Sequence, residues 1–83
     1  MRILYFAWVR EKIGHGEEAF ELPSDLQSIA DVIDWLETKG ENYQAAFRER
    51  KAIRAAVNQN HVSLDSPIAG ATEIAFFPPV TGG

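Results

Sequence analysis

The sequence predicts an α+β domain in which one main helix packs on one face of a mixed β-sheet. Three observations lead to this class. An apolar run rich in aromatic and β-branched residues opens the chain, a segment with helical periodicity follows, and further strand-like segments complete it. Runs of strands separated by a helix in this order are typical of α+β folds. With 83 residues, the chain forms one small domain with a single layer of helix against a sheet.

Two strands are predicted at the start of the chain. The run Ile3–Val9 is continuously apolar, and Ala19–Leu22 follows the turn Gly14-His15-Gly16, so the pair forms a hairpin. Alternation along the first strand produces two apolar rows: Ile3, Tyr5, Ala7 and Val9 on one face, and Leu4, Phe6 and Trp8 on the other. Both faces are therefore apolar, although one helix covers only one of them.

The main helix is predicted to begin after Ser28, which is the expected N-cap, with Asp31 three residues later. Gly40 is expected at the left-handed position that ends the helix. The apolar face has the spacing i, i+3, i+4, i+7 and consists of Ile29, Val32, Ile33 and Leu36. Asp31, Asp34 and Glu37 share the polar face, where we expect solvated carboxylates without a chemical role.

The second half of the chain is predicted to hold a short helix and three strands. The helix lies around Tyr43–Arg50, and period-two alternation indicates a strand at Ile53–Asn58. A tight turn at Gln59-Asn60 leads into a short strand at His61–Leu64, and Glu73–Phe77 is the last strand. The predicted order is therefore β-β-α-(α)-β-β-β.

The uncovered face of the sheet is predicted to bind a partner. In the last strand Ala75 and Phe77 share one face while Ile74 and Phe76 share the other, which repeats the two-sided pattern of the first strand. For any single aromatic side chain, coverage by a loop or by the second helix is an equal alternative. For the whole row a partner interface is the better explanation, because monomers rarely expose large contiguous apolar patches.

Composition excludes several classes of protein. The net charge of −4 argues against nucleic-acid binding, and no apolar run is long enough to span a membrane. The chain has no Cys, which excludes disulfides, thiolate zinc sites and a cysteine nucleophile, and fits a cytoplasmic location. Neither His15 nor His61 has the spacing of a metal site or a catalytic triad. A basic cluster could dock an acidic partner or be ordinary solvated charge: Arg48, Arg50, Lys51 and Arg54.

The C-terminal segment is the unusual part of the sequence. Residues 1–77 are predicted to form the domain, and residues 78–83 an extended, flexible tail, because Pro78 and Pro79 end the last strand. Gly82 and Gly83 have no side chains, so the tip can enter a narrow channel. The reactive group of this tip is the α-carboxylate of Gly83.

Three segments carry a resemblance to a known family: the ending FFPPVTGG, the opening ILYFAWVRE with Gly14, and AAVNQ at Ala55–Gln59. Together they resemble the MoaD-type ubiquitin-like family, the small sulfur-carrier subunits of molybdopterin synthase. The resemblance implies the β-grasp fold of ubiquitin. It also implies that an ATP-dependent activating enzyme adenylates Gly83, that a sulfur donor converts the adenylate to a thiocarboxylate, and that the sulfur is donated for the dithiolene of molybdopterin.

By the same resemblance, the carrier is not an enzyme on its own and binds no permanent cofactor or metal; ATP is used by the activating enzyme. Its partner is the large synthase subunit, which supplies the catalytic side chains in a hetero-oligomer. The residues that would enter the large subunit with Gly83 are Pro78, Pro79, Val80, Thr81 and Gly82. The residues at family contact positions are Phe6, Arg10, His61 and Phe77. Relatives often carry an aliphatic residue at the position of His61.

Two other functions are compatible with the pattern. A carrier for thiazole or tRNA thiolation would share the Gly-Gly end, but the Phe-Pro-Pro-Val-Thr stem argues against it. A non-catalytic β-grasp binding module or a protein-conjugation tag would use the open face without the sulfur chemistry. Deletion of Gly83 separates a carrier from a binding module.

Overall fold

The computed structural model describes residues 1–79 and confirms the α+β class. Within these residues five strands form one mixed sheet in the order β2-β1-β5-β3-β4, with β1 parallel to β5 and the other neighbours antiparallel. The strands are β1 (Arg2–Tyr5), β2 (Glu17–Ala19), β3 (Arg54–Val57), β4 (Asn60–Val62) and β5 (Glu73–Phe77). The helices are α1 (Ala7–Ile13), α2 (Ile29–Glu37), α3 (Glu41–Ala46) and the short 3₁₀ helix η1 (Arg50–Ala52).

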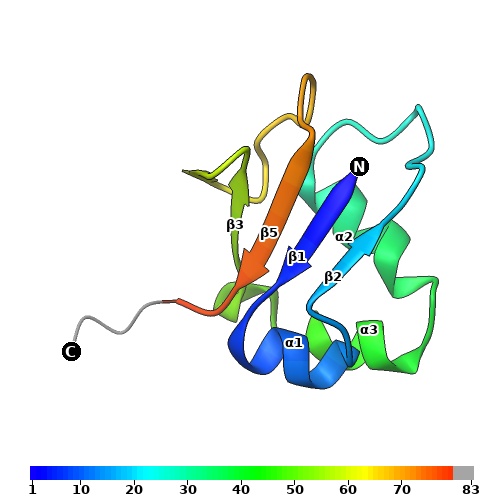
Figure 1. Cartoon of the computed structure of the whole chain (residues 1–83), viewed down its shortest axis with the longest axis vertical. Helices are drawn as coiled ribbons and strands as arrows, with labels where there is room; N and C mark the ends of the chain where they lie inside the picture. Colours follow the sequence, from blue (N-terminus) through cyan, green and yellow to red (C-terminus); the bar gives the residue numbers. More distant parts are fainter. Residues whose placement is uncertain (80–83) are drawn as a thin grey trace.

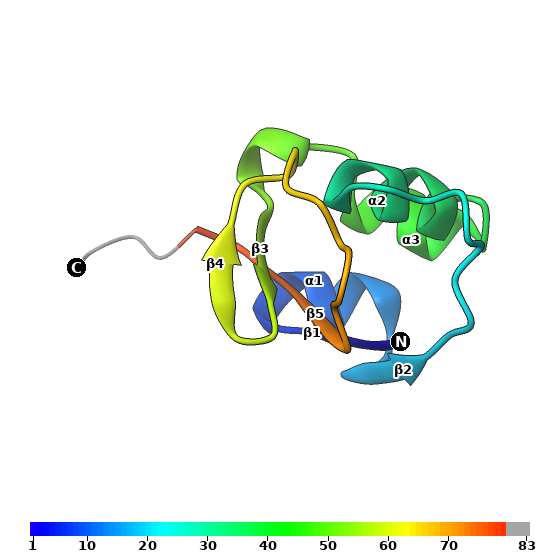
Figure 2. The ribbon, with the colours of Figure 1, turned by 90° about the horizontal axis from the view of Figure 1, so that it is seen from above.

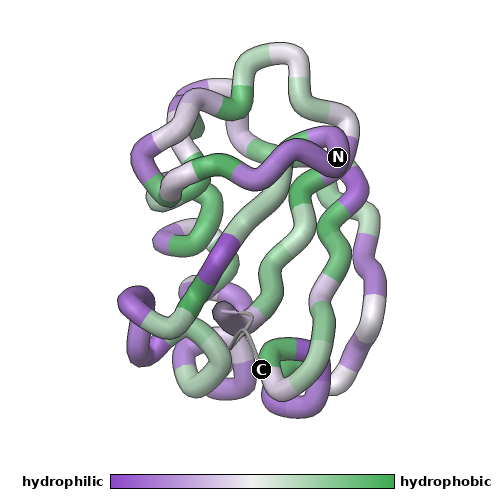
Figure 3. The backbone as a smooth tube through the Cα atoms, turned by 90° about the vertical axis from the view of Figure 1, so that its left-hand side faces the viewer, coloured by the Kyte–Doolittle hydropathy of each residue, from purple (hydrophilic) through white to green (hydrophobic). Residues whose placement is uncertain are grey.

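The helices α2 and α3 lie behind the sheet, and among residues 1–79 no helix covers the face that Figure 1 shows in front (Figures 1 and 2). The core lies between the sheet and α2, whose four predicted apolar residues are all fully buried. They pack in one cluster with Ile3, Tyr5, Ile74 and Phe76 from the two central strands. Figure 3 shows the hydrophobic residues along the strands inside the molecule and hydrophilic residues in the outer turns. The prediction of a helix-covered face and an open face is confirmed.

The predicted strand Ile3–Val9 is wrong beyond Tyr5, because the chain turns into α1 after Phe6. The turn places Ala7 at a left-handed φ of 52°, a conformation that costs a non-glycine residue about 1–2 kcal/mol. Burial of Val9 and Ile13 against the core offsets this cost. The helix ends at Gly14, whose φ of 94° lets its amide donate to the Arg10 carbonyl oxygen at 2.8 Å.

The predicted start of the main helix is confirmed. The Ser28 hydroxyl accepts a hydrogen bond from the Asp31 amide at 3.2 Å. The Asp31 carboxylate in turn accepts from the amides of Gln27 and Ser28, and these bonds lower the pKa of Asp31. The predicted role of Gly40 is wrong: Thr38 is the C-cap, and Gly40 has extended backbone and precedes α3.

Other boundaries differ from the sequence prediction. The second strand is Glu17–Ala19 instead of Ala19–Leu22, and the second helix ends at Ala46. The predicted turn at Gln59-Asn60 lies one residue earlier, because Asn58 and Gln59 have the positive φ values of a two-residue hairpin loop. The bounds of β5 are as predicted. Pairing partners decide these ends, which local composition does not encode.

Candidate functional site

The open face of the sheet carries a hollow of about 620 Å³, which we call the open-face hollow. Its floor is apolar and comes from the three central strands, while its border includes aromatic and polar side chains. The lining residues are Arg2, Leu4, Phe6, Ala56, Gln59, His61, Glu73, Ala75 and Phe77. This hollow lies on the face that the sequence predicted to bind a partner.

Strand register explains why these side chains share one face. Leu4 on β1 is the pairing partner of Ala75 on β5, and Ala75 is the partner of Ala56 on β3. His61 on β4 is in turn the partner of Ala56. Paired residues point to the same side of a sheet, so this row and Phe77, two residues after Ala75, face away from the helices. The intervening residues Ile74 and Phe76 face the core and are fully buried.

Phe6 is the most exposed apolar feature of the site. Among residues 1–79 it is the one large hydrophobic side chain that is exposed, with 48% of its surface accessible. Its backbone is extended, and its amide donates to the Phe76 carbonyl oxygen at 3.0 Å. This bond holds Phe6 beside the end of β5, although β1 has already ended. The turn at Ala7 thus leaves an aromatic ring available for contact.

His61 and Phe77 form the opposite border of the hollow. Their ring centroids are 5.0 Å apart with the planes tilted by 51°. Phe77 is half-buried, whereas His61 is exposed. His61 therefore lies beside the open face. In this chain the imidazole ring packs on the aromatic ring.

Arg10 lies outside the open-face hollow. It is on α1, one helical turn after Phe6, and its amide donates to the Phe6 carbonyl oxygen at 3.3 Å. A Cβ at Gly16 would lie 3.1 Å from the Arg10 side-chain Nε, so the guanidinium group lies against this glycine. The structure therefore brings three of the four predicted contact residues together and places the fourth beside them.

Charged side chains at the other end of the open face form ion pairs. The Arg2 guanidinium donates to Glu17 at 2.7 Å and to Glu73 at 3.4 Å. The hydrogen bond from Arg2 lowers the pKa of the Glu17 carboxyl and, with the charge of Glu17, raises the pKa of Arg2. These pairs leave the apolar centre and the aromatic border as the features available for binding.

The predicted tail begins at the end of β5. Pro78 and Pro79 follow the strand and are half-buried. The predictions for Val80, Thr81, Gly82 and Gly83 lie outside the described residues. The open-face hollow adjoins the strand that leads into this segment, since Phe77 belongs to both.

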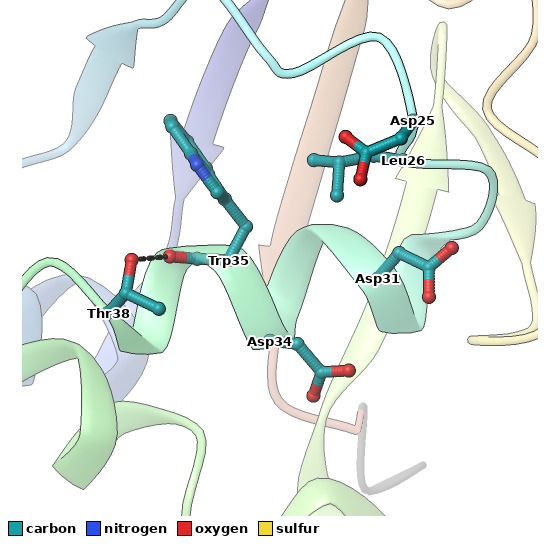
Figure 4. Close-up of a pocket in the computed structure, with 6 residues that line it drawn as sticks. All are labelled: Asp25, Leu26, Asp31, Asp34, Trp35 and Thr38. Carbon is teal, nitrogen blue, oxygen red and sulfur yellow. Dashed lines mark hydrogen bonds between the residues drawn. The ribbon is translucent and has the colours of Figure 1, made fainter.

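The carboxylates of α2 have structural partners. Asp31 and Asp34 border a shallow hollow with Asp25, Leu26, Trp35 and Thr38, and Figure 4 shows that the side chains of Asp25, Asp31 and Asp34 do not converge on one point. Asp31 caps the helix, and Asp34 and Glu37 both pair with Arg50. Although partial burial opposes the charged form, these hydrogen bonds raise the pKa of Arg50. Within the part of the chain that the structure describes, no three His, Asp or Glu side chains form a candidate metal site.

A further hollow, of about 280 Å³, was missed by the sequence analysis. It lies between α1 and the segment from α3 to η1 and is lined by Trp8, Lys12, Ala45, Ala46, Arg48, Glu49 and Ala52. We call it the Trp8 hollow. The prediction that Trp8 joins Leu4 and Phe6 on the open face is wrong, because Trp8 belongs to α1 and lines this hollow instead of the open-face hollow. The i, i+4 spacing of the buried apolar residues Val9 and Ile13 was the available signal for this helix.

Among residues 1–79, a mixed five-stranded sheet with helices on one face and an apolar hollow beside the last strand define a small ubiquitin-like β-grasp protein. No helix among residues 1–79 has the length and hydrophobicity needed to cross a membrane. The chain belongs to the ThiS family, whose model matches residues 3–83.

Curated relatives and solved structures agree with this family. The chain is 37% identical over 83 residues to the molybdopterin synthase sulfur carrier subunit of Escherichia coli, covering all of this chain and 99% of the relative. It is 39% identical to the protein of the same name from Haemophilus influenzae, with the same coverage. The crystal structure of SAMP1 from Haloferax volcanii is similar with a TM-score of 0.71 and 25% identity, over all of this chain and 98% of that one. The predicted ubiquitin-like fold and family are thereby confirmed.

Proposed function

We propose that this chain is the sulfur carrier subunit of a molybdopterin synthase and that the carboxylate of Gly83 is the group that carries the sulfur. One observation carries the proposal: the chain matches two bacterial sulfur carrier subunits along all of its 83 residues. The family model also extends to Gly83. The expected partner is the large subunit of the synthase, as the names of the relatives imply.

The proposed chemistry has two steps on Gly83. An activating enzyme joins the carboxylate to the AMP part of ATP and releases pyrophosphate, because a carboxylate is a poor electrophile without a leaving group. A sulfur donor then displaces AMP, and the product is a thiocarboxylate whose sulfur is an anionic nucleophile at neutral pH. This sulfur is transferred for the dithiolene of molybdopterin within the synthase complex. ATP is a substrate of the activating enzyme, and the catalytic side chains belong to the large subunit.

The open-face hollow has the properties that this role requires. Phe6 and Phe77 present aromatic surface for a partner, and His61 extends that surface along β4. The hollow adjoins the strand that leads into Pro78 and Pro79. A partner bound to this rigid face would receive the following segment in a defined direction, and Arg10 lies where it can add a charged contact at the edge. Pre-organised docking of this kind reduces the entropic cost of inserting an extended segment.

Mass spectrometry of the intact protein tests the proposal. The protein is incubated with ATP, a cognate activating enzyme and a sulfur donor, and the expected gain is the mass difference between one sulfur and one oxygen atom, localised to Gly83. The matched control is a variant that lacks Gly83, which should keep its thermal unfolding midpoint and show no gain. If the full-length protein shows no gain while the activating enzyme modifies a control carrier, the proposal is wrong. A binding module of the same fold would keep its function without Gly83.

A further inference from the structure

The end of the sheet at which β5 terminates carries basic side chains that have no acidic partner. Lys12 on α1, Arg48 after α3, Lys51 in η1 and Arg54 on β3 are all exposed. Within residues 1–79, the ion pairs at 4.0 Å or less involve only Arg2 and Arg50 among the basic residues. We call Lys12, Arg48, Lys51 and Arg54 the basic rim.

The basic rim lies around the end of β5. Arg54 is the pairing partner of Phe77, the last residue of that strand. Its guanidinium donates to the carbonyl oxygens of Lys51 at 2.9 Å and Ile53 at 3.0 Å, which ties it to η1. Lys12 and Arg48 border the Trp8 hollow on α1 and beyond α3. Figure 1 shows α1 at the same end of the molecule as the C-terminal end of β5.

This local positive charge contrasts with the rest of the chain, whose net charge is −4. Arg50, the remaining member of the predicted basic cluster, is neutralised by Asp34 and Glu37. The rim also differs from a nucleic-acid surface, because Glu49 lies among its cations and the Trp8 hollow between Lys12 and Arg48 is largely apolar. A phosphate backbone requires continuous positive charge, whereas a protein surface can match cations, a carboxylate and an apolar hollow together.

We propose that the basic rim docks on carboxylates that border the channel through which a protein partner receives the C-terminal segment. The inference rests on the proposed function, because it takes the large synthase subunit as that partner. The cations of the basic rim and the carboxylates of the partner attract each other before contact. This attraction accelerates association and aligns the C-terminal segment with the channel entrance. The Trp8 hollow would receive an apolar side chain of the same partner surface, because Lys12 and Arg48 of the rim border it.

The test compares two lysine reversals that change the net charge equally. Lys51→Glu alters the rim, and Lys39→Glu alters a lysine whose Nζ lies 4.1 Å from the centre of the Trp35 ring, away from the rim. Association of each protein with the large subunit is followed by stopped-flow fluorescence at about 50 mM and about 500 mM salt, conditions of weak and strong screening. We expect Lys51→Glu to slow association at low salt and Arg48→Glu/Lys51→Glu to slow it at least tenfold. Lys39→Glu should remain within twofold, and all rates should converge at high salt.

The outcomes separate the inference from the proposed function. If Lys51→Glu and Lys39→Glu change the low-salt rate equally, the effect is one of net charge and the basic rim is overturned while the proposed function stands. If the unaltered protein does not bind the large subunit, both fall. Binding of each protein to a single-stranded RNA oligonucleotide is also measured. If the unaltered protein binds the RNA, the double variant does not, and both associate equally fast with the large subunit, the inference is overturned in favour of nucleic acid. Unchanged unfolding midpoints for all variants exclude a folding defect.

Discussion

Replacing Phe6 by Ala is expected to weaken partner binding strongly and folding little. The ring is 48% exposed in the free protein, which for a side chain of about 200 Å² leaves about 100 Å² for a partner to cover. At about 25 cal/mol per Å², the loss is about 2.5 kcal/mol, or about 60-fold in the dissociation constant. The bond from the Phe6 amide to the Phe76 carbonyl oxygen involves only backbone atoms, so Ala retains it.

Isothermal titration against the large subunit and against the activating enzyme measures this effect. Phe6→Leu is the matched control, since it keeps most of the apolar area and should recover most of the affinity. Thermal unfolding of both variants checks that the domain remains folded. Affinities of Phe6→Ala within twofold of the unaltered protein for both partners would refute the role of Phe6 as an anchor and, with it, the assignment of the open-face hollow as the docking surface.

Three further predictions concern the domain itself. Tyr5→Phe should raise the free energy of unfolding by about 1 kcal/mol in a denaturant titration, because the buried Tyr5 hydroxyl has no hydrogen-bond partner among residues 1–79; a loss of stability would contradict this. Gly14→Ala should lower the free energy of unfolding by about 1 kcal/mol through backbone strain alone, since φ at Gly14 is 94° and nothing lies within 4 Å of the added Cβ. An unchanged unfolding midpoint would show that the turn relaxes. Asp31→Asn should flatten the loss of stability in acid. The amides of Gln27 and Ser28 lower the pKa of Asp31 from its ordinary value of 3.8. The contribution of the ionised carboxylate to the free energy of unfolding is therefore complete above pH 3.8 and disappears as the pH falls through the lower pKa of the folded state. Identical pH profiles of the two proteins would exclude this role.

The candidate site was predictable where it depends on alternation and spacing. Alternation of side chains in β5, whose bounds were predicted correctly, places Ala75 and Phe77 on the same face of the sheet. The cap at Ser28 and the buried face of α2 follow from helical spacing and the hydrogen-bonding capacity of Ser and Asp. Phe6 was also assigned to the open face, although the element that follows it was not foreseen. The structure places Phe6 there through its bond to Phe76, a residue seventy positions away.

The Trp8 hollow and the basic rim could not be predicted from local sequence. A short apolar run such as Ile3–Val9 is compatible with either a strand or a buried helix. The turn from β1 into α1 requires a left-handed backbone conformation at Ala7, which the neighbouring residues do not indicate. Likewise, the four residues of the basic cluster predicted from the sequence have different partners. Arg50 reaches two carboxylates on α2, whereas Arg48, Lys51 and Arg54 remain unpaired within the described part of the chain.

The sequence by itself determined the α+β class and the apolar open face, because periodicity, capping residues and side-chain chemistry are local properties of the chain. The resemblance of three segments to a known family implied the glycine that is proposed to carry sulfur. Only the tertiary structure decided where β1 stops, which rings meet around the open-face hollow and which cations are neutralised. These features depend on contacts between residues far apart in sequence. The free energy of burying Val9 and Ile13 in the common core can exceed the local cost of the turn at Ala7 that brings them there.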